Sequence, residues 1–78
     1  MIYFIQCEIR VNGRFIDKFT HSFAYETQEK ANAKLSEYIE RDIKDGFKKT
    51  DTNTVMNDSI TGQTEYKYEI VSLVLDRF

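Results

Sequence analysis

The sequence predicts the α+β class: an antiparallel sheet of three to four strands with one helix packed on one face, in the order ββαβ or ββαββ. Residues 2–11 alternate between apolar and polar side chains, which is typical of a strand with one buried face. Residues 12–13 are Asn-Gly, the strongest short hairpin signal. Apolar residues then recur at helical spacing between residues 28 and 45. With 78 residues there is room for one modest core, so we expect residues 1–78 to form a single domain.

The first strand has one mostly apolar face and one mixed face. The polar residues Gln6, Glu8 and Arg10 share a parity with Ile2 and Phe4, so the first half of the strand is apolar on both sides. The mostly apolar face consists of Tyr3, Ile5, Cys7, Ile9 and Val11.

The second strand is expected over residues 14–23, and two registers are open to it. A two-residue loop would place Ile9 opposite Ile16, whereas a three-residue loop with a bulge at Gly13 would place Ile9 opposite Phe15 and Arg10 opposite Arg14. We favour the bulged loop, with Gly13 at positive φ, because it brings the phenylalanines of this strand, Phe15 and Phe19, onto the apolar face. Asp17 and His21 then share that face, so the strand should lie at an edge of the sheet.

A helix is expected over residues 28–45. Thr27 is a suitable N-cap, and Glu29 in the first turn complements the helix dipole. Gly46 suits the first position after the helix. The apolar stripe is made of Ala31, Leu35, Tyr38, Ile39 and Ile43.

The remaining chain is read as a long polar connection over residues 48–64, with one short strand at 53–60 as an option, and a last strand over 65–75. A right-handed crossover would place this last strand beside the first and antiparallel to it, giving the sheet order 2-1-last. Two stretches that are apolar on both faces, residues 2–5 and 71–75, then become neighbours. We expect this corner to serve self-association or partner contact. Its outward-facing residues are Ile2, Phe4, Val71 and Leu73.

Charge and composition exclude several classes of protein. Eleven Lys and Arg against thirteen Asp and Glu give a net charge of −2, which argues against a strongly basic nucleic-acid binder. A single Cys excludes an internal disulfide and a cysteine zinc cluster, and it favours a reducing cytoplasm. No apolar run is long enough to span a membrane, and the first residues do not resemble a signal peptide.

The residues that could support catalysis or metal binding are better explained by structural roles in the fold. Cys7 lies in the middle of the apolar face, where a buried inert thiol is expected. His21 shares a face with Asp17 but has no second His or Cys for a metal. Asp51, Asn53, Asn57 and Asp58 lack the spacing of a calcium loop. We therefore expect no enzyme activity, no catalytic residue, no metal and no cofactor.

Two resemblances bear on function. The first resemblance is to the arm-type DNA-binding domain of phage-type tyrosine integrases, and it covers about residues 3–45. It rests on two strands joined by an Asn-Gly-Arg turn, followed by the run FAYETQEKA from Phe23 to Ala31, which opens a helix. That family has a three-stranded sheet on a helix and reads DNA with a basic, aromatic sheet face. The resemblance implies Arg10, Arg14 and Lys18 as the basic residues of such a face, beside Glu8.

The second resemblance is one of type. A small, slightly acidic α+β chain is similar to small inhibitors from phages and mobile elements, anti-CRISPR proteins among them. The hypothesis ranked first is therefore a non-catalytic protein-binding module that inhibits a host defence complex in the host cytoplasm by covering a functional surface. A DNA-binding or regulatory module of the integrase-arm type is the alternative. We expect a host protein complex as the partner, with a homodimer as a further option, nucleic acid ranked below, and no membrane. The candidate partner-binding residues are Glu8, Arg10, Arg14, Lys18, Glu65 and Glu69.

Overall fold

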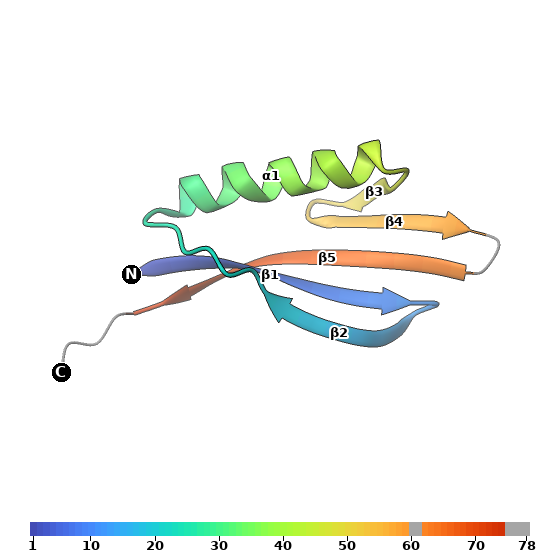
Figure 1. The fold of residues 1–78 in the computed structure, drawn as a ribbon, viewed down its shortest axis with the longest axis horizontal. Coiled ribbons are helices and arrows are strands. Elements are labelled where there is room, and N and C mark those ends of the chain that lie inside the picture. Colours follow the sequence, from blue (N-terminus) through green and yellow to red (C-terminus); the bar gives the residue numbers. More distant parts are fainter. Residues whose placement is uncertain (60–61, 75–78) are drawn as a thin grey trace.

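Five antiparallel strands and one helix make up the part of the chain, residues 1–59 and 62–74, that the computed structural model describes. Figure 1 shows the helix lying along one side of the sheet. The strands are β1 (Ile2–Val11), β2 (Arg14–Thr20), β3 (Lys48–Asp51), β4 (Thr54–Ser59) and β5 (Gly62–Leu73), and the helix is α1 (Gln28–Lys44). The sheet order is β2-β1-β5-β4-β3. The α+β class and the placement of the last strand beside the first, antiparallel to it, are confirmed.

The expected polar connection over 48–64 is wrong. Its residues form β3, β4 and the start of β5, so the sheet has five strands where three to four were expected. The optional strand at 53–60 exists as β4, although residue 60, like the expected end of the last strand at Leu75, lies outside the described residues. A strand this polar is stable because it is interior to the sheet: β5 and β3 supply its hydrogen-bonding partners, and its Val55 is fully buried.

The β1–β2 hairpin differs from both registers considered for it. Val11 lies opposite Arg14, so the turn has two residues, and both Asn12 (φ 53) and Gly13 (φ 79) are left-handed, as a type I′ turn requires. The bulge lies further along: Arg10 is opposite Phe15 and Ile9 is opposite Asp17, so the extra residue is Ile16.

This bulge decides which face each β2 side chain takes. It brings Phe19 opposite Cys7, on the face turned towards α1, but leaves Phe15 on the other face opposite Arg10. The predicted pairs Arg10–Arg14 and Ile9–Phe15 are therefore wrong. Positive φ at Gly13 is confirmed.

The helix follows its predicted signals closely. The Thr27 hydroxyl accepts a hydrogen bond from the Lys30 N–H at 3.2 Å, which is the N-cap interaction expected. After Lys44 the chain leaves the helix through Gly46, at φ 100. The buried residues of α1 are Ala31, Leu35, Ile39 and Asp42.

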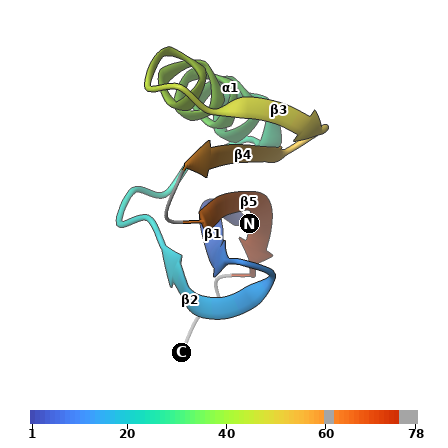
Figure 2. The same cartoon turned by 90° about the vertical axis from the view of Figure 1, so that its right-hand side faces the viewer.

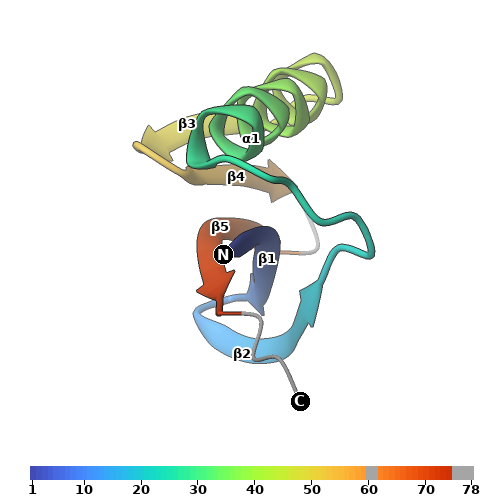
Figure 3. The same ribbon diagram turned by 90° about the vertical axis from the view of Figure 1, so that its left-hand side faces the viewer.

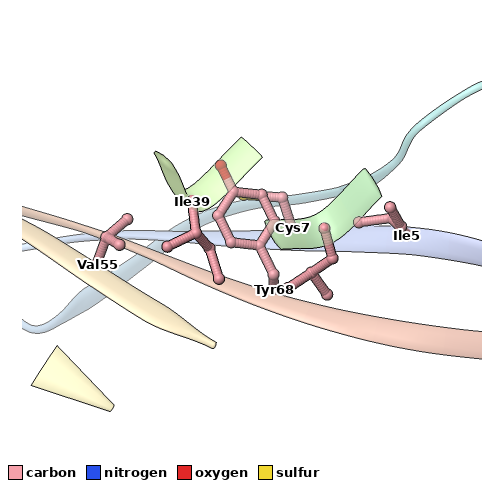
Figure 4. Packing of buried hydrophobic residues seen from close by; sticks show 6 residues of the cluster. Ile5, Cys7, Ile39, Val55 and Tyr68 are labelled. Carbon is pink, nitrogen blue, oxygen red and sulfur yellow. The ribbon is translucent and has the colours of Figure 1, made fainter. Parts of the chain in front are cut away.

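The core lies between α1 and the face of the sheet that carries Ile5 and Cys7. Figure 4 shows how side chains from β1, α1, β4 and β5 meet there. Tyr68 contributes an aromatic ring to this layer and is 3% exposed. The buried cluster comprises Ile5, Cys7, Leu35, Ile39, Val55 and Tyr68.

The helix covers only part of the sheet. It packs against β1, β3, β4 and β5 but not against β2, which is the strand farthest from α1 in Figures 2 and 3. All seven residues of β2 are exposed as a result. The opposite face of the sheet, which carries Phe4, Glu8 and Arg10, has no helix on it; we call it the outer face.

Both edge strands are protected against further pairing. β2 carries the bulge at Ile16, and the Asp17 carboxylate accepts a hydrogen bond from the Lys18 N–H at 2.8 Å. Antiparallel pairs alternate in hydrogen bonding, and the His21 N–H donates to the Ile5 carbonyl. The Lys18 N–H therefore points to the open edge, where Asp17 occupies it. At the other edge, β3 is short, begins with two lysines and is bulged between Lys49 and Asp51.

Candidate interaction surface

Six charged residues alternate in sign across the outer face. Glu8 on β1 lies between Lys18 on β2 and Lys67 on β5. Two residues along β1, Arg10 lies opposite Glu65. We call this set the charged face, and its members are Glu8, Arg10, Lys18, Glu65, Lys67 and Glu69.

The charges of this face are largely balanced within the protein. Arg10 Nε lies 2.6 Å from Glu8 Oε2, and Lys18 Nζ lies 3.9 Å from Glu69 Oε2. The hydrogen bond that Arg10 donates to the Glu8 carboxylate lowers the pKa of Glu8 and raises the pKa of Arg10. Three cations and three carboxylates in alternation leave little net field for a polyanion.

Five of the six predicted partner-binding residues lie together on the charged face. The exception is Arg14, which lies opposite Val11 beside the turn. Lys67 belongs to the face but was not predicted. Lys67 has the same parity as Glu65 and Glu69 on the last strand, and this pattern in the sequence could have predicted its place on the face.

The apolar corner proposed from the sequence is also assembled. Ile2 lies opposite Leu73, and Phe4 lies opposite Val71, so the four side chains occupy one end of the outer face. Leu73 is 55% exposed, whereas the other three are partly buried. None of the four packs against the core cluster.

A third feature was not predicted: large apolar side chains are exposed along β2 and the segment that follows it. They are Phe15, Ile16, Phe19 and Phe23, which are 56%, 57%, 41% and 66% exposed, and we call them the β2 rim. Phe15 and Phe19 were both predicted on the apolar face with Ile9, and this is wrong for Phe15, which the bulge turns to the outer face. Phe19 does lie on the predicted face but stays exposed, because α1 does not reach β2.

The core also holds polar groups whose contacts stabilise the fold and do not form a reactive site. The Tyr68 hydroxyl donates to Asp42 Oδ2 at 2.5 Å, and Asp42 is 4% exposed. Burial, with a smaller effect of Asp42, raises the pKa of the Cys7 thiol to about 11. This disfavours the thiolate that a nucleophile needs. His21 makes no ion pair with Asp17 among the described residues, and the Asp17 carboxylate binds the Lys18 N–H instead.

Within residues 1–59 and 62–74, no group of three or more His, Cys, Asp or Glu side chains could hold a metal ion. The helix in this part of the chain is too short and too polar to cross a membrane. Comparisons with protein-family models, with curated proteins and with solved structures found no match.

Proposed function

We propose that this protein is a non-catalytic protein-binding module that acts in a host cytoplasm as a phage-type inhibitor of a defence complex, of the anti-CRISPR kind, by covering a functional surface of that complex. The observation that best supports binding is the β2 rim. Four large apolar side chains, three on β2 and one on the segment that follows it, are each more than two-fifths exposed, with Phe15 and Phe19 on opposite faces of the strand. Exposed apolar groups of this size mark interaction sites more often than they occur by chance on a monomer.

The three surface features suggest different roles in binding. Phenylalanines of the β2 rim are suited to fill pockets of a partner and to supply most of the binding energy. The charged face is suited to select the partner and its orientation, because its alternating charges reject a surface whose pattern does not match. The apolar corner is the candidate for self-association.

The alternative of a DNA-binding module is supported less well. Arg10 is held by Glu8 and Lys18 lies near Glu69, so a phosphate would have to displace carboxylates to reach either cation. Steeply salt-dependent binding to duplex DNA would overturn the protein-binding proposal.

The proposal is tested by capturing the partner complex from host extract and measuring its affinity for designed variants. We expect Phe15→Ser to weaken binding at least about tenfold, or about 1.4 kcal/mol. Ile43→Ser is the matched control, because Ile43 is 45% exposed on α1, away from β2. Equal loss in both variants, or in neither, would contradict a role for the β2 rim.

Inhibition itself needs a functional readout. Expression of the chain should restore infection by a phage that the intact defence system blocks, and Phe15→Ser should abolish this rescue while Ile43→Ser retains it. Phe4→Glu separates self-association from partner binding: light scattering reports the loss of a dimer, and the affinity for the captured complex reports the partner contact.

Paired charge reversals test the charged face. If Arg10→Glu with Lys18→Glu and Glu65→Lys with Glu69→Lys each leave the affinity within about tenfold of the unmodified chain, the charged face does not take part in recognition.

A further inference from the structure

The single histidine of the chain occupies an unusual position. It directly follows β2, and its Nε2 atom is closed off from solvent without a hydrogen-bond partner in the described part of the chain. Buried polar atoms are nearly always paired, so an exception calls for an explanation.

The imidazole ring links β2 to the helix. It stacks on Tyr38 of α1, with ring centroids 4.6 Å apart and planes at 18°. On its other side, Phe19 of the β2 rim approaches at 5.3 Å and 64°. α1 does not pack against β2 itself. Among the described residues, this aromatic stack therefore connects the helix to Phe19, at the end of the strand.

The groups around the ring do not favour a positive charge on it. From α1, the Arg41 guanidinium lies 5.0 Å from the centroid of the Tyr38 ring, and together with burial, the larger cause, it lowers the pKa of His21 below the usual 6.5. From β1 and β5, Cys7 and Tyr68 are held neutral because burial raises the pKa of each.

Two carboxylates lie on the elements that the ring links, Asp17 on β2 and Asp42 on α1, but both are engaged. On β2, Asp17 accepts the Lys18 N–H. On α1, Asp42 accepts the Tyr68 hydroxyl. Neither makes an ion pair with His21 among the described residues.

We propose that His21 is a pH-sensitive latch that ties the end of β2, with Phe19 of the β2 rim, to α1 when neutral and releases it when protonated. A proton on the ring would add a cation beside Arg41 and a buried donor with no acceptor, so the imidazolium is favoured only where the ring has left the stack and reached water. The latch is a property of the chain alone. Its regulatory meaning, loss of a presented binding surface under acidic conditions, rests on the proposed function.

The direction of the pH effect on the latch follows from the linkage between proton binding and stability. The folded pKa lies below the unfolded value, so the latched state is fully favoured above about pH 6.5 and loses stability as the pH falls below it. Between pH 7 and pH 5 the population of the released state should rise about tenfold.

Amide hydrogen exchange on the full chain measures this release without any partner. After correction for intrinsic rates, we expect the protection of the Phe19 and His21 amides, which face β1, to fall about tenfold from pH 7 to pH 5, while that of mid-β5 amides changes by less than about twofold. The matched control is His21→Phe, which keeps an aromatic ring in the stack but cannot take up a proton. Its β2 protection should be independent of pH over this range.

Two results would overturn the latch: β2 protection that changes no more than that of β5, or an equal fall in His21→Phe. A second measurement covers the case in which His21→Phe does not fold. In the unmodified chain, the imidazole Cε1 proton and the ring protons of Phe19 should titrate together in NMR spectra with a midpoint below 6.5. A midpoint at or above that value, or a Phe19 ring that does not respond, would also refute the latch.

Discussion

The buried hydrogen bond between Tyr68 and Asp42 gives the sharpest test of how the core is held together. Tyr68→Phe removes one hydroxyl and leaves the ring in place, so the change creates almost no cavity. It takes away the donor that lies 2.5 Å from the Asp42 carboxylate, which is 4% exposed. Arg41, 3.8 Å from the other carboxylate oxygen and largely exposed, is too distant to replace that donor.

The expected loss is about 2–3 kcal/mol, because a hydrogen bond to a charged group contributes roughly 1.5–3 kcal/mol and a buried acceptor is left unpaired. A chain of this size has a total stability of about 4–12 kcal/mol. The melting temperature should therefore fall by about 10–20 °C.

Urea unfolding of the purified chain, followed by circular dichroism, measures this loss. Tyr66→Phe is the matched control: Tyr66 lies two residues away on the same strand face, partly buried, and no hydrogen bond to its hydroxyl occurs within the described chain, so its loss should stay below about 0.5 kcal/mol. Combining Tyr68→Phe with Asp42→Leu should cost less than the sum of the single changes, since no charge is then left unpaired. Additive losses, or a Tyr68→Phe loss no larger than the control, would show that the bond does not stabilise the core.

Three further predictions follow from single contacts. Gly62→Ala should lower the free energy of unfolding by about 1–3 kcal/mol, because φ is 143° and the new Cβ would lie 2.6 Å from Asn12 Oδ1. Gly13→Ala is the control: no described heavy atom lies within 4 Å of its new Cβ, so it should cost only about 1 kcal/mol, from the backbone. Equal losses in urea titrations of the two variants would contradict the steric argument. The Cys7 thiol is 2% exposed, so it should be alkylated at least about 100-fold more slowly in the native chain than in urea at pH 8. Because the pKa of this thiol is raised from 9.0 to about 11, its contribution to stability is present below pH 9 and is lost as the pH rises towards 11. Cys7→Ala should reduce this alkaline loss of stability. Asp17→Val frees the Lys18 N–H at the open edge and should raise light scattering at high concentration, whereas Glu65→Val on β5, which is paired with β1 and β4 on its two sides, should not.

Elements with a strong local signal were predictable. β1, the hairpin turn and α1 each combine a clear period with a specific turn or cap, and the structure places them within a few residues of the predicted bounds. The pairing of β1 with the last strand was predictable too, because two stretches apolar on both faces had to meet.

β3 and β4 were missed, or left optional, for a physical reason. Between them they hold only two apolar residues, Val55 and Met56. β3 pairs with β4, and β4 pairs with β5, in successive hairpins. Their stability comes from this backbone pairing, which leaves no period in the sequence. The bulge at Ile16 has the same character, because Ile16 itself has no feature that marks a bulge.

The position of the charged face was predictable, but the pairing of its charges was not. Parity placed Glu8 and Arg10 on one face, the favoured register added Lys18, and all three lie there in the structure. The pairing of their charges with those of β5 depends on the register. The exposure of Phe15 depends on the bulge, and that of Phe19 on how far α1 extends across the sheet. Neither quantity can be read from residue types.

Under the proposed function, the protected edge strands bear on how many copies bind at one target. β2 carries a bulge and an occupied N–H, and β3 carries lysines and a bulge, so neither strand offers a ready backbone template to a second copy. We therefore expect binding through side chains, with each target site filled once. Occupancy should then rise with concentration along a simple saturation curve, and the amount of protein needed for full effect should equal the number of target sites in the cell.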